Sequence, residues 1–118
     1  MHPCIGASVA SADVRFTSVA CGAGHTLALT ANGCVVSFGR GAFGALGHGD
    51  RLNRDVPRVV DALWSVGVTQ IGAGDNHSVA LSASGRVYTW GRGKYGALGH
   101  GDVENRSKPT LMRALEHA

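Results

Sequence analysis

The feature that most constrains this chain is an internal repeat. Residues 22–50 read GAGHTLALTANGCVVSFGRGAFGALGHGD, and residues 74–102 read GDNHSVALSASGRVYTWGRGKYGALGHGD. Equivalent residues such as His25 and His77 lie 52 positions apart (77 − 25 = 52), and the match needs no gap. A fixed period of this size is typical of repeat architectures. We therefore expect two copies of one structural unit, and we expect the duplicated residues to serve that unit.

Each copy carries the pattern of short antiparallel strands. Residues 27–30 and 79–82 alternate apolar side chains with small or polar ones, which indicates half-buried strands. An Asn-Gly pair at 32–33 and a Ser-Gly pair at 84–85 favour tight turns. The β-branched and aromatic runs 35–38 and 87–90 favour partner strands. Further strands are predicted over 16–21, 57–60, 68–73 and 109–112. Pro57 and Pro109 suit the first residue of a strand or an edge, because proline cannot donate to a ladder.

Four antiparallel strands in a repeat of about 50 residues fit one blade of a β-propeller. The predicted fold is all-β: an N-terminal segment 1–12, a first four-stranded antiparallel blade 13–63 and a second blade 64–118. No stretch shows a sustained helical period, and 61–64 and 112–117 are expected to form a helical turn at most. Because two blades leave the ring incomplete, we expect a piece of a larger propeller or self-association.

The repeated residues resemble a known family. Val19–Leu29 and Ile71–Leu81 are similar to the Gly-x-x-His segment of regulator of chromosome condensation repeats, and the following aromatic-Gly-Arg-Gly-x-aromatic-Gly-x-Leu-Gly-His-Gly-Asp run resembles the same repeat. The resemblance extends over residues 13–115 and implies a propeller that is seven-bladed in family members. The repeat-motif residues are Gly22, His25, Gly33, Gly39, Gly44, Leu46, Gly47, Gly49, Gly74, His77, Gly85, Trp90, Gly91, Gly96, Leu98, Gly99 and Gly101.

The resemblance implies more than one function, because one fold can carry many activities. Family members include the nuclear exchange factor for the small GTPase Ran, HECT-type ubiquitin ligases, ciliary regulators and a plant ultraviolet-B photoreceptor. We expect a non-enzymatic scaffold module whose loops bind protein partners. The alternatives are guanine-nucleotide exchange on a Ran-like small GTPase with chromatin association, and the regulatory propeller of a multidomain ubiquitin ligase or kinase. The photoreceptor's tryptophan before the repeat histidine is replaced by Gly24 and Asn76, which argues against ultraviolet sensing.

Two glycine-rich segments match the GxGxxG pattern, Gly39–Gly44 and Gly91–Gly96. A dinucleotide site needs a helix that starts inside this pattern, so that the helix N-terminus meets the pyrophosphate. Here more glycines follow, and the pattern occurs twice. We therefore expect tight turns between strands and no cofactor.

Four histidines occupy matched positions in the two copies: His25, His48, His77 and His100. A metal needs several ligands that converge on one point, whereas the repeat places equivalent histidines on different blades. We expect no metal site, and we expect His25 and His77 to hydrogen-bond to nearby backbone carbonyls. There is no GxSxG nucleophile elbow, and no catalytic residue is expected.

Other duplicated residues are also expected to build the blades. The aromatic pairs, Phe38 with Trp90 and Phe43 with Tyr95, favour core or blade-to-blade packing. The duplicated charged residues are expected to form salt bridges within or between blades: Arg40, Arg54, Arg92, Arg106, Asp50 and Asp102.

Residues that bind a partner are expected where the two copies differ. The candidate partner-facing residues are Asp75, Asn76, Lys94 and Glu104, which replace Ala23, Gly24, Ala42 and Leu52. Val103 likewise replaces Arg51. All of these positions fall in predicted loops, where binding residues concentrate.

Composition excludes several other classes of protein. The net charge of +3 comes from scattered residues without a basic cluster, so there is no direct nucleic-acid signal. No apolar run reaches the roughly 20 residues of a membrane-spanning helix, and the N-terminus is a poor signal peptide. Three cysteines without a CxxC pattern indicate reduced thiols. We therefore expect an intracellular location, cytoplasmic or nuclear.

Overall fold

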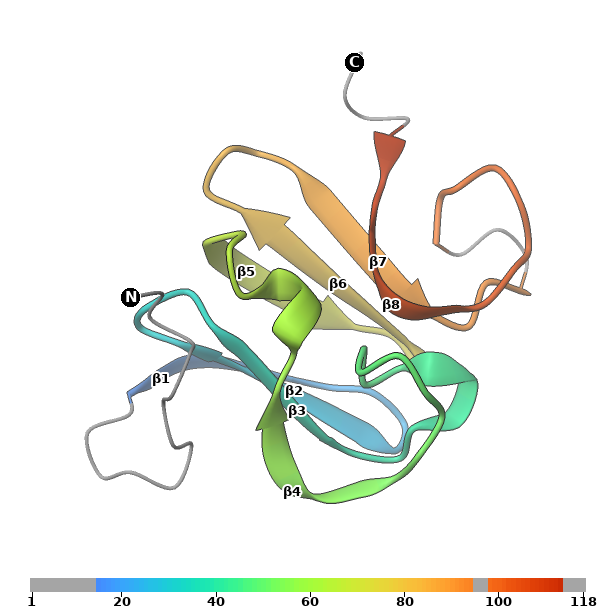
Figure 1. Ribbon diagram of the computed structural model, residues 1–118, viewed down its shortest axis with the longest axis horizontal. Coiled ribbons are helices and arrows are strands. Elements are labelled where there is room, and N and C mark those ends of the chain that lie inside the picture. The colour runs from blue at the N-terminus through green and yellow to red at the C-terminus, as the bar shows by residue number, and fades with distance from the viewer. Residues whose placement is uncertain (1–14, 95–97, 114–118) are drawn as a thin grey trace.

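The computed structural model describes residues 15–94 and 98–113, which form two four-stranded antiparallel sheets side by side (Figure 1). The first blade contains β1 (Phe16–Cys21), β2 (His25–Thr30), β3 (Val35–Gly39) and β4 (Arg54–Val59). The second blade contains β5 (Val68–Ala73), β6 (His77–Ser82), β7 (Val87–Gly91) and β8 (Arg106–Leu111). In each blade the order in the sheet equals the order in the chain. The prediction of an all-β chain with two four-stranded blades is confirmed.

The register repeats from one blade to the next. His25 pairs with Gly39 in the first blade, and His77 pairs with Gly91 in the second. The connection between the blades carries the short 3-10 turn η2 (Asp61–Leu63), next to the expected boundary between 63 and 64. The expected segment 1–12 and the end of the second expected helical turn, residues 114–117, lie outside the described residues.

The turn of each central hairpin depends on its glycine. Gly33 has φ +84° and Gly85 has φ +86°, a conformation that side chains other than glycine rarely adopt. The hydroxyl at the end of the preceding strand completes the turn: Thr30 Oγ1 accepts a hydrogen bond from the Cys34 amide at 3.0 Å. Its counterpart Ser82 does the same in the second blade. The turns are thus specified locally, by a hydroxyl and a glycine three residues later.

The fourth strand of each blade begins earlier than the sequence predicts. β4 starts at Arg54 and β8 at Arg106, so the predicted starts at Pro57 and Pro109 are wrong, whereas the edge position that proline also suits is confirmed. Both strands lie at the edge of their sheet, where a residue without an N–H can sit inside a strand without breaking a ladder. The pairing with the third strand is also irregular at this point in both blades.

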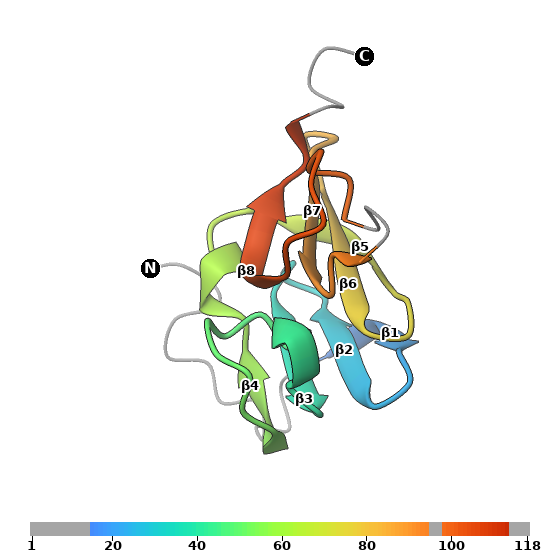
Figure 2. The ribbon, with the colours of Figure 1, turned by 90° about the vertical axis from the view of Figure 1, so that its right-hand side faces the viewer.

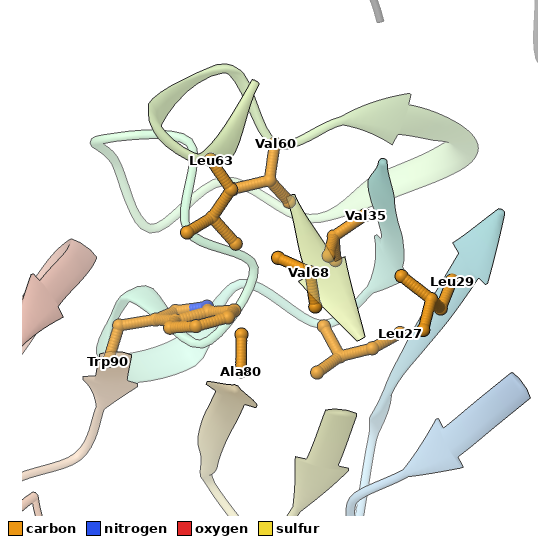
Figure 3. Packing of buried hydrophobic residues seen from close by; sticks show 8 residues of the cluster. All are labelled: Leu27, Leu29, Val35, Val60, Leu63, Val68, Ala80 and Trp90. Carbon is orange, nitrogen blue, oxygen red and sulfur yellow. The ribbon is translucent and has the colours of Figure 1, made fainter. Parts of the chain in front are cut away.

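The hydrophobic core lies between the blades (Figure 3). The first blade contributes Leu27, Leu29 and Val35, the second contributes Val68, Ala80 and Trp90, and the connection adds Val60 and Leu63. Trp90 has no exposed surface. Burial of one face of each sheet against the other supplies the main favourable term for folding. β6 alternates between buried and half-buried residues, because only one of its faces meets the first blade.

Two further sequence expectations can be compared with the structure. Cys21 is free and exposed, but Cys34 is disulfide-bonded, so the expectation of reduced thiols is wrong for Cys34. Within residues 15–94 and 98–113, no helix is long and apolar enough to cross a membrane.

Candidate functional site

Loops from both blades gather at one end of the sheets, which we call the loop end. It comprises residues 22–24 and 40–53 of the first blade, and 74–76, 92–94 and 98–105 of the second. The strand register dictates this grouping: Ala73 pairs with Ser78, His77 with Gly91, and Gly91 with Arg106. The central hairpin turns and the connection between blades lie at the opposite end. The loop end is therefore where the chain offers most of its irregular backbone.

Duplicated charged residues brace the loop end from within each blade. Asp50 forms a salt bridge with Arg54 at 2.7 Å, and Asp102 forms the same bridge with Arg106 at 2.8 Å. The second oxygen of Asp50 accepts a hydrogen bond from the Leu52 amide at 3.0 Å. Each carboxylate thus ties the start of an edge strand to the loop before it, as expected for these duplicated charges.

Two asparagines close the same loops. Asn53 Oδ1 accepts a hydrogen bond from the Gly41 amide at 3.0 Å, and Asn105 Oδ1 accepts one from the Gly93 amide at the same distance. Because these side chains satisfy backbone donors, they are occupied by the scaffold. The sequence analysis did not single them out, although their duplication was visible.

The first GxGxxG segment contacts the second blade and helps to hold the two blades together. It holds the 3-10 turn η1 (Ala42–Gly44), and its continuation bonds the Gly49 amide to the Ser107 carbonyl at 2.9 Å. Phe43 adopts φ +60°, and the Arg92 guanidinium lies 4.8 Å from the centre of its ring. This cation–π contact joins the two blades. Within the described residues the segment packs against β8; Tyr95 and Gly96 of the second copy lie outside them.

A histidine–hydroxyl pair also crosses between the blades. Ser78 Oγ donates a hydrogen bond to the Ala45 carbonyl at 2.8 Å and lies 3.0 Å from His25 Nε2. Because a hydroxyl carries one proton, Ser78 must accept its second bond from the Nε2–H of His25. His25 therefore has a hydroxyl partner on the neighbouring blade in addition to its backbone hydrogen bond at His77. Local sequence cannot reveal the hydroxyl partner.

The same chemistry occurs inside each blade. Ser37 Oγ donates to the Leu46 carbonyl at 2.7 Å and lies 2.9 Å from His48 Nε2. Thr89 and His100 repeat this arrangement at 2.8 Å in the second blade. In all three pairs the hydroxyl already donates to a carbonyl, so the imidazole Nε2–H is the donor to the hydroxyl oxygen. Within the described residues, no group of three or more potential ligand side chains could hold a metal.

His77 differs from its counterpart His25. His25 is 3% exposed, whereas His77 is half-buried and has no side-chain hydrogen bond with a described residue. His77 lines a groove of about 350 Å³ with Val79 and Leu81. The equivalent residues in the first blade, Leu27 and Leu29, are buried against the second blade. The outer face of the second blade thus corresponds to the face of the first blade that the second blade covers.

Burial sets the protonation of two histidines. Desolvation lowers the pKa of His25 below its ordinary value of 6.5, and nearby His77 lowers it further against an opposing backbone hydrogen bond. Burial also lowers the pKa of His48, and the positive charges of Arg58 and Arg54 act in the same direction. Both lowered pKa values favour the neutral imidazole.

These pKa shifts predict that acid destabilises the protein. A histidine with a lowered folded-state pKa binds fewer protons than it does in the unfolded chain. Its contribution to stability is present above the unfolded pKa of about 6.5 and is lost as the pH falls through the folded pKa. We expect the urea concentration at the midpoint of unfolding to decrease as the pH is lowered from 7.5 to 5.5. His25→Gln should weaken this dependence, and an unchanged slope in that variant would contradict the assignment.

The residues predicted to face a partner all lie at the loop end of the second blade. Asp75, Lys94 and Glu104 are exposed, and Asn76 is half-buried. The backbone carbonyl of Asp75 accepts a hydrogen bond from the Ala23 amide at 3.0 Å, and that of Asn76 accepts one from Arg92 at 2.9 Å. The structure therefore places these positions on loops that are bonded to each other and to the first blade.

Exposed apolar residues accompany these charges. Leu52 is 60% exposed and Val103 is 65% exposed, in equivalent loops of the two blades. The sequence analysis noted Val103 but missed Leu52, which occupies the position of Glu104 in the other copy. An apolar residue in a glycine-rich loop, outside any strand alternation, is the signal that could have found it. Such residues are candidates for contact with a protein.

The repeat matches a known family of proteins. A family model of the regulator of chromosome condensation (RCC1) repeat matches residues 32–81 and 84–118, and a second model of this repeat matches 16–45 and 68–97. The chain belongs to the RCC1 repeat family. Both models recur after 52 residues (84 − 32 = 52; 68 − 16 = 52), the period of the sequence and of the blades.

Several RCC1 relatives are similar along most of this chain. Human E3 ubiquitin-protein ligase HERC2 is 41% identical over 114 residues, 97% of this chain and 2% of HERC2. The ultraviolet-B receptor UVR8 of Arabidopsis thaliana is 40% identical over 89% of this chain and 24% of the receptor. Among solved structures, Prp20p from Saccharomyces cerevisiae superposes with a TM-score of 0.77 at 27% identity, covering 86% of this chain and 26% of Prp20p. The chain thus spans about a quarter or less of these RCC1 relatives.

Proposed function

We propose that this chain is a non-enzymatic protein-interaction module that binds partners through its loop end. The proposal rests on a difference between two groups of residues, those that form contacts within the scaffold and those that remain exposed. Duplicated polar groups are used in contacts within and between the blades, such as His25 with Ser78 and Asp50 with Arg54. Exposed apolar side chains, Leu52 and Val103, remain at the loop end. Apolar residues surrounded by polar ones are typical of protein interfaces.

The similarity to Prp20p supports protein partners as the class of ligand. The reported properties of Prp20p include binding to Gsp1p and to histones, and yeast RCC1 (Prp20) has also been solved bound to Kap60. The proposal for this chain extends only to the loop end and to proteins as its ligands. It includes an intracellular location, cytoplasmic or nuclear. Self-association or the addition of further repeats to complete a propeller stays a prediction, which a solution mass would test.

Guanine-nucleotide exchange on a small GTPase is the second candidate function. The likeness to Prp20p, with its binding to Gsp1p, favours it. Release of bound nucleotide from Gsp1p, measured with and without this chain, separates the two functions. Faster release supports exchange, and binding without faster release supports the non-enzymatic module.

A regulatory propeller within a ubiquitin ligase or kinase is the third candidate function. Identity to HERC2 over almost the whole chain favours a ligase. A ligase or kinase catalytic domain in the same polypeptide would support it.

The interaction proposal predicts that the apolar residues at the loop end are needed for binding. We expect Leu52→Ser with Val103→Ser to weaken binding to Gsp1p, histones or Kap60 by about tenfold or more, because each side chain would lose its burial against the partner. Both residues are largely exposed, so the fold should survive. Calorimetry or surface plasmon resonance with each purified protein provides the measurement.

Val56→Ser is the matched control for this experiment. Val56 is 71% exposed but lies in β4, outside the residues of the loop end, so its replacement should leave binding unchanged. The proposal fails if none of the three proteins binds, or if the control weakens binding as much as the double variant.

A further inference from the structure

A polar groove lies between the blades, away from the interaction residues just described. Its volume is about 280 Å³, and it is lined by Gly47, His48, Arg58, Asp61, Ala62 and Lys108. Arg58 comes from β4 of the first blade and Lys108 from β8 of the second. Figure 2 shows η2, which contains Asp61, beside β8. The groove is therefore built jointly by the two blades and exists only when they are packed together.

The cations of this groove lack partners in the scaffold. Arg58 and Lys108 are exposed, and neither forms an ion pair within residues 15–94 and 98–113. In this they differ from Arg54 and Arg106, which are paired with Asp50 and Asp102. The two cations that line the groove are thus available for an anion.

These two cations are also absent from the repeat. The equivalent of Arg58 is Thr110, and the equivalent of Lys108 is Val56 (58 + 52 = 110; 108 − 52 = 56). Residues needed by every blade recur in both copies, whereas Arg58 and Lys108 each occur in one. The blade architecture therefore does not account for them.

The surroundings of the groove leave room for a ligand and favour negative charge. Gly49 has no Cβ, and one built there would lie 2.8 Å from Lys108 Cε, so glycine makes space for the lysine side chain. Gly47, which lines the groove, lies over the buried Nε1 of Trp90, which has no hydrogen-bond partner. Burial and then the charges of Arg58 and Arg54 keep the pKa of His48 low, against the opposing effect of Asp50 and Asp61. Two cations, Arg58 and Lys108, and one carboxylate, Asp61, line the groove, so positive charge prevails in it.

We propose that this groove binds an acidic side chain of a protein partner, either a carboxylate or a phosphorylated residue, between Arg58 and Lys108. The two cations come from different blades, so the anion would be held by both blades at once. Asp61 lines the same groove and limits its affinity. The site is separate from the loop-end residues Leu52 and Val103, and it adds an anion-binding function to the module.

Calorimetry with short peptides tests this site at low ionic strength, where exposed charges are least screened. The probes are acetylated hexaglutamate, a phosphoserine peptide, and hexaglutamine as the neutral control. We expect the two acidic peptides to bind and hexaglutamine not to bind. The tighter of the two acidic peptides identifies the preferred oxyanion. Inorganic phosphate alone should bind more weakly than either peptide.

Variants separate a specific groove from general positive charge. Arg58→Ala with Lys108→Ala should weaken hexaglutamate binding about five- to tenfold, in the range expected for two exposed ion pairs. Arg15→Ala with Arg86→Ala removes the same charge from exposed residues outside the groove and should have little effect. Asp61→Asn should strengthen binding, which loss of a merely structural residue would not do.

Three results would overturn the proposal: no binding by the unaltered protein, an equal loss in both double variants, or no gain from Asp61→Asn. Leu52→Ser with Val103→Ser should leave peptide binding unchanged. Failure of the groove proposal can therefore be distinguished from failure of the proposed interaction module.

Discussion

Trp90→Ala is expected to lower the free energy of unfolding by about 3–5 kcal/mol, the range for deleting a large buried aromatic side chain. Trp90 has no exposed surface, and in Figure 3 its indole lies beside Leu63 and Ala80 in the core between the blades. Removing it loses the burial of the ring and leaves a cavity that a rigid sheet cannot fill. Urea unfolding followed by circular dichroism measures the change.

Trp90→Phe is the control that separates ring packing from the indole N–H. Phenylalanine stands at the equivalent position in the first blade, Phe38. Trp90 Nε1 is buried without a partner, so phenylalanine removes an unsatisfied donor while it keeps much of the apolar volume. We expect a loss below about 1.5 kcal/mol, as for substitutions that nearly conserve volume. Equal losses in the two variants would show that the aromatic ring does not hold the blades together.

Gly44→Ala should cause the second largest loss of stability, about 2–4 kcal/mol. Gly44 has φ +80°, and a Cβ at this position would lie 2.5 Å from Ser107 Cα in the second blade. The obstruction is backbone of an edge strand and not a flexible side chain, so the two blades would have to separate locally. The same urea titration measures this effect.

Gly101→Ala is the matched comparison for Gly44. Gly101 also has φ +80°, but nothing lies within 4 Å of its Cβ position. Its replacement should lower the free energy of unfolding by about 1–2 kcal/mol, the cost of a left-handed backbone conformation for a residue other than glycine. The difference between the two variants isolates the contact between blades. If Gly101→Ala is as damaging as Gly44→Ala, backbone conformation alone explains the requirement for glycine.

Much of the fold could be predicted because the decisive signals are local and occur twice. Alternation around Leu27 and Val79, and the glycines at 33 and 85, specify hairpins without reference to the rest of the chain. The start of β4 at Arg54 could not be predicted, because an edge strand forms where a neighbour offers free backbone groups. Pro57 indicates a later start for this strand, but the pairing of Arg54 with Gly39 of β3 extends the strand to Arg54.

The candidate site was harder to predict because its contacts cross between blades. The bond from His25 to Ser78 joins residues 53 positions apart, and no short motif contains both. The groove between Arg58 and Lys108 has the same character, since it depends on how two sheets meet. The loop candidates could be named from differences between the copies, but Leu52 matters through its exposure, which only the structure gives.

The histidine–hydroxyl bond between blades has a consequence for how such arrays grow. The first blade offers an imidazole and the second offers a hydroxyl, so the joint is head-to-tail and has a direction. Thr26 occupies in the first blade the position that Ser78 occupies in the second, and His77 occupies that of His25. Each repeat thus carries both partners of the contact, a histidine for one neighbouring blade and a hydroxyl for the other. Duplication of the repeat in register therefore adds a blade with complementary contact residues, and each added blade uses the same interface.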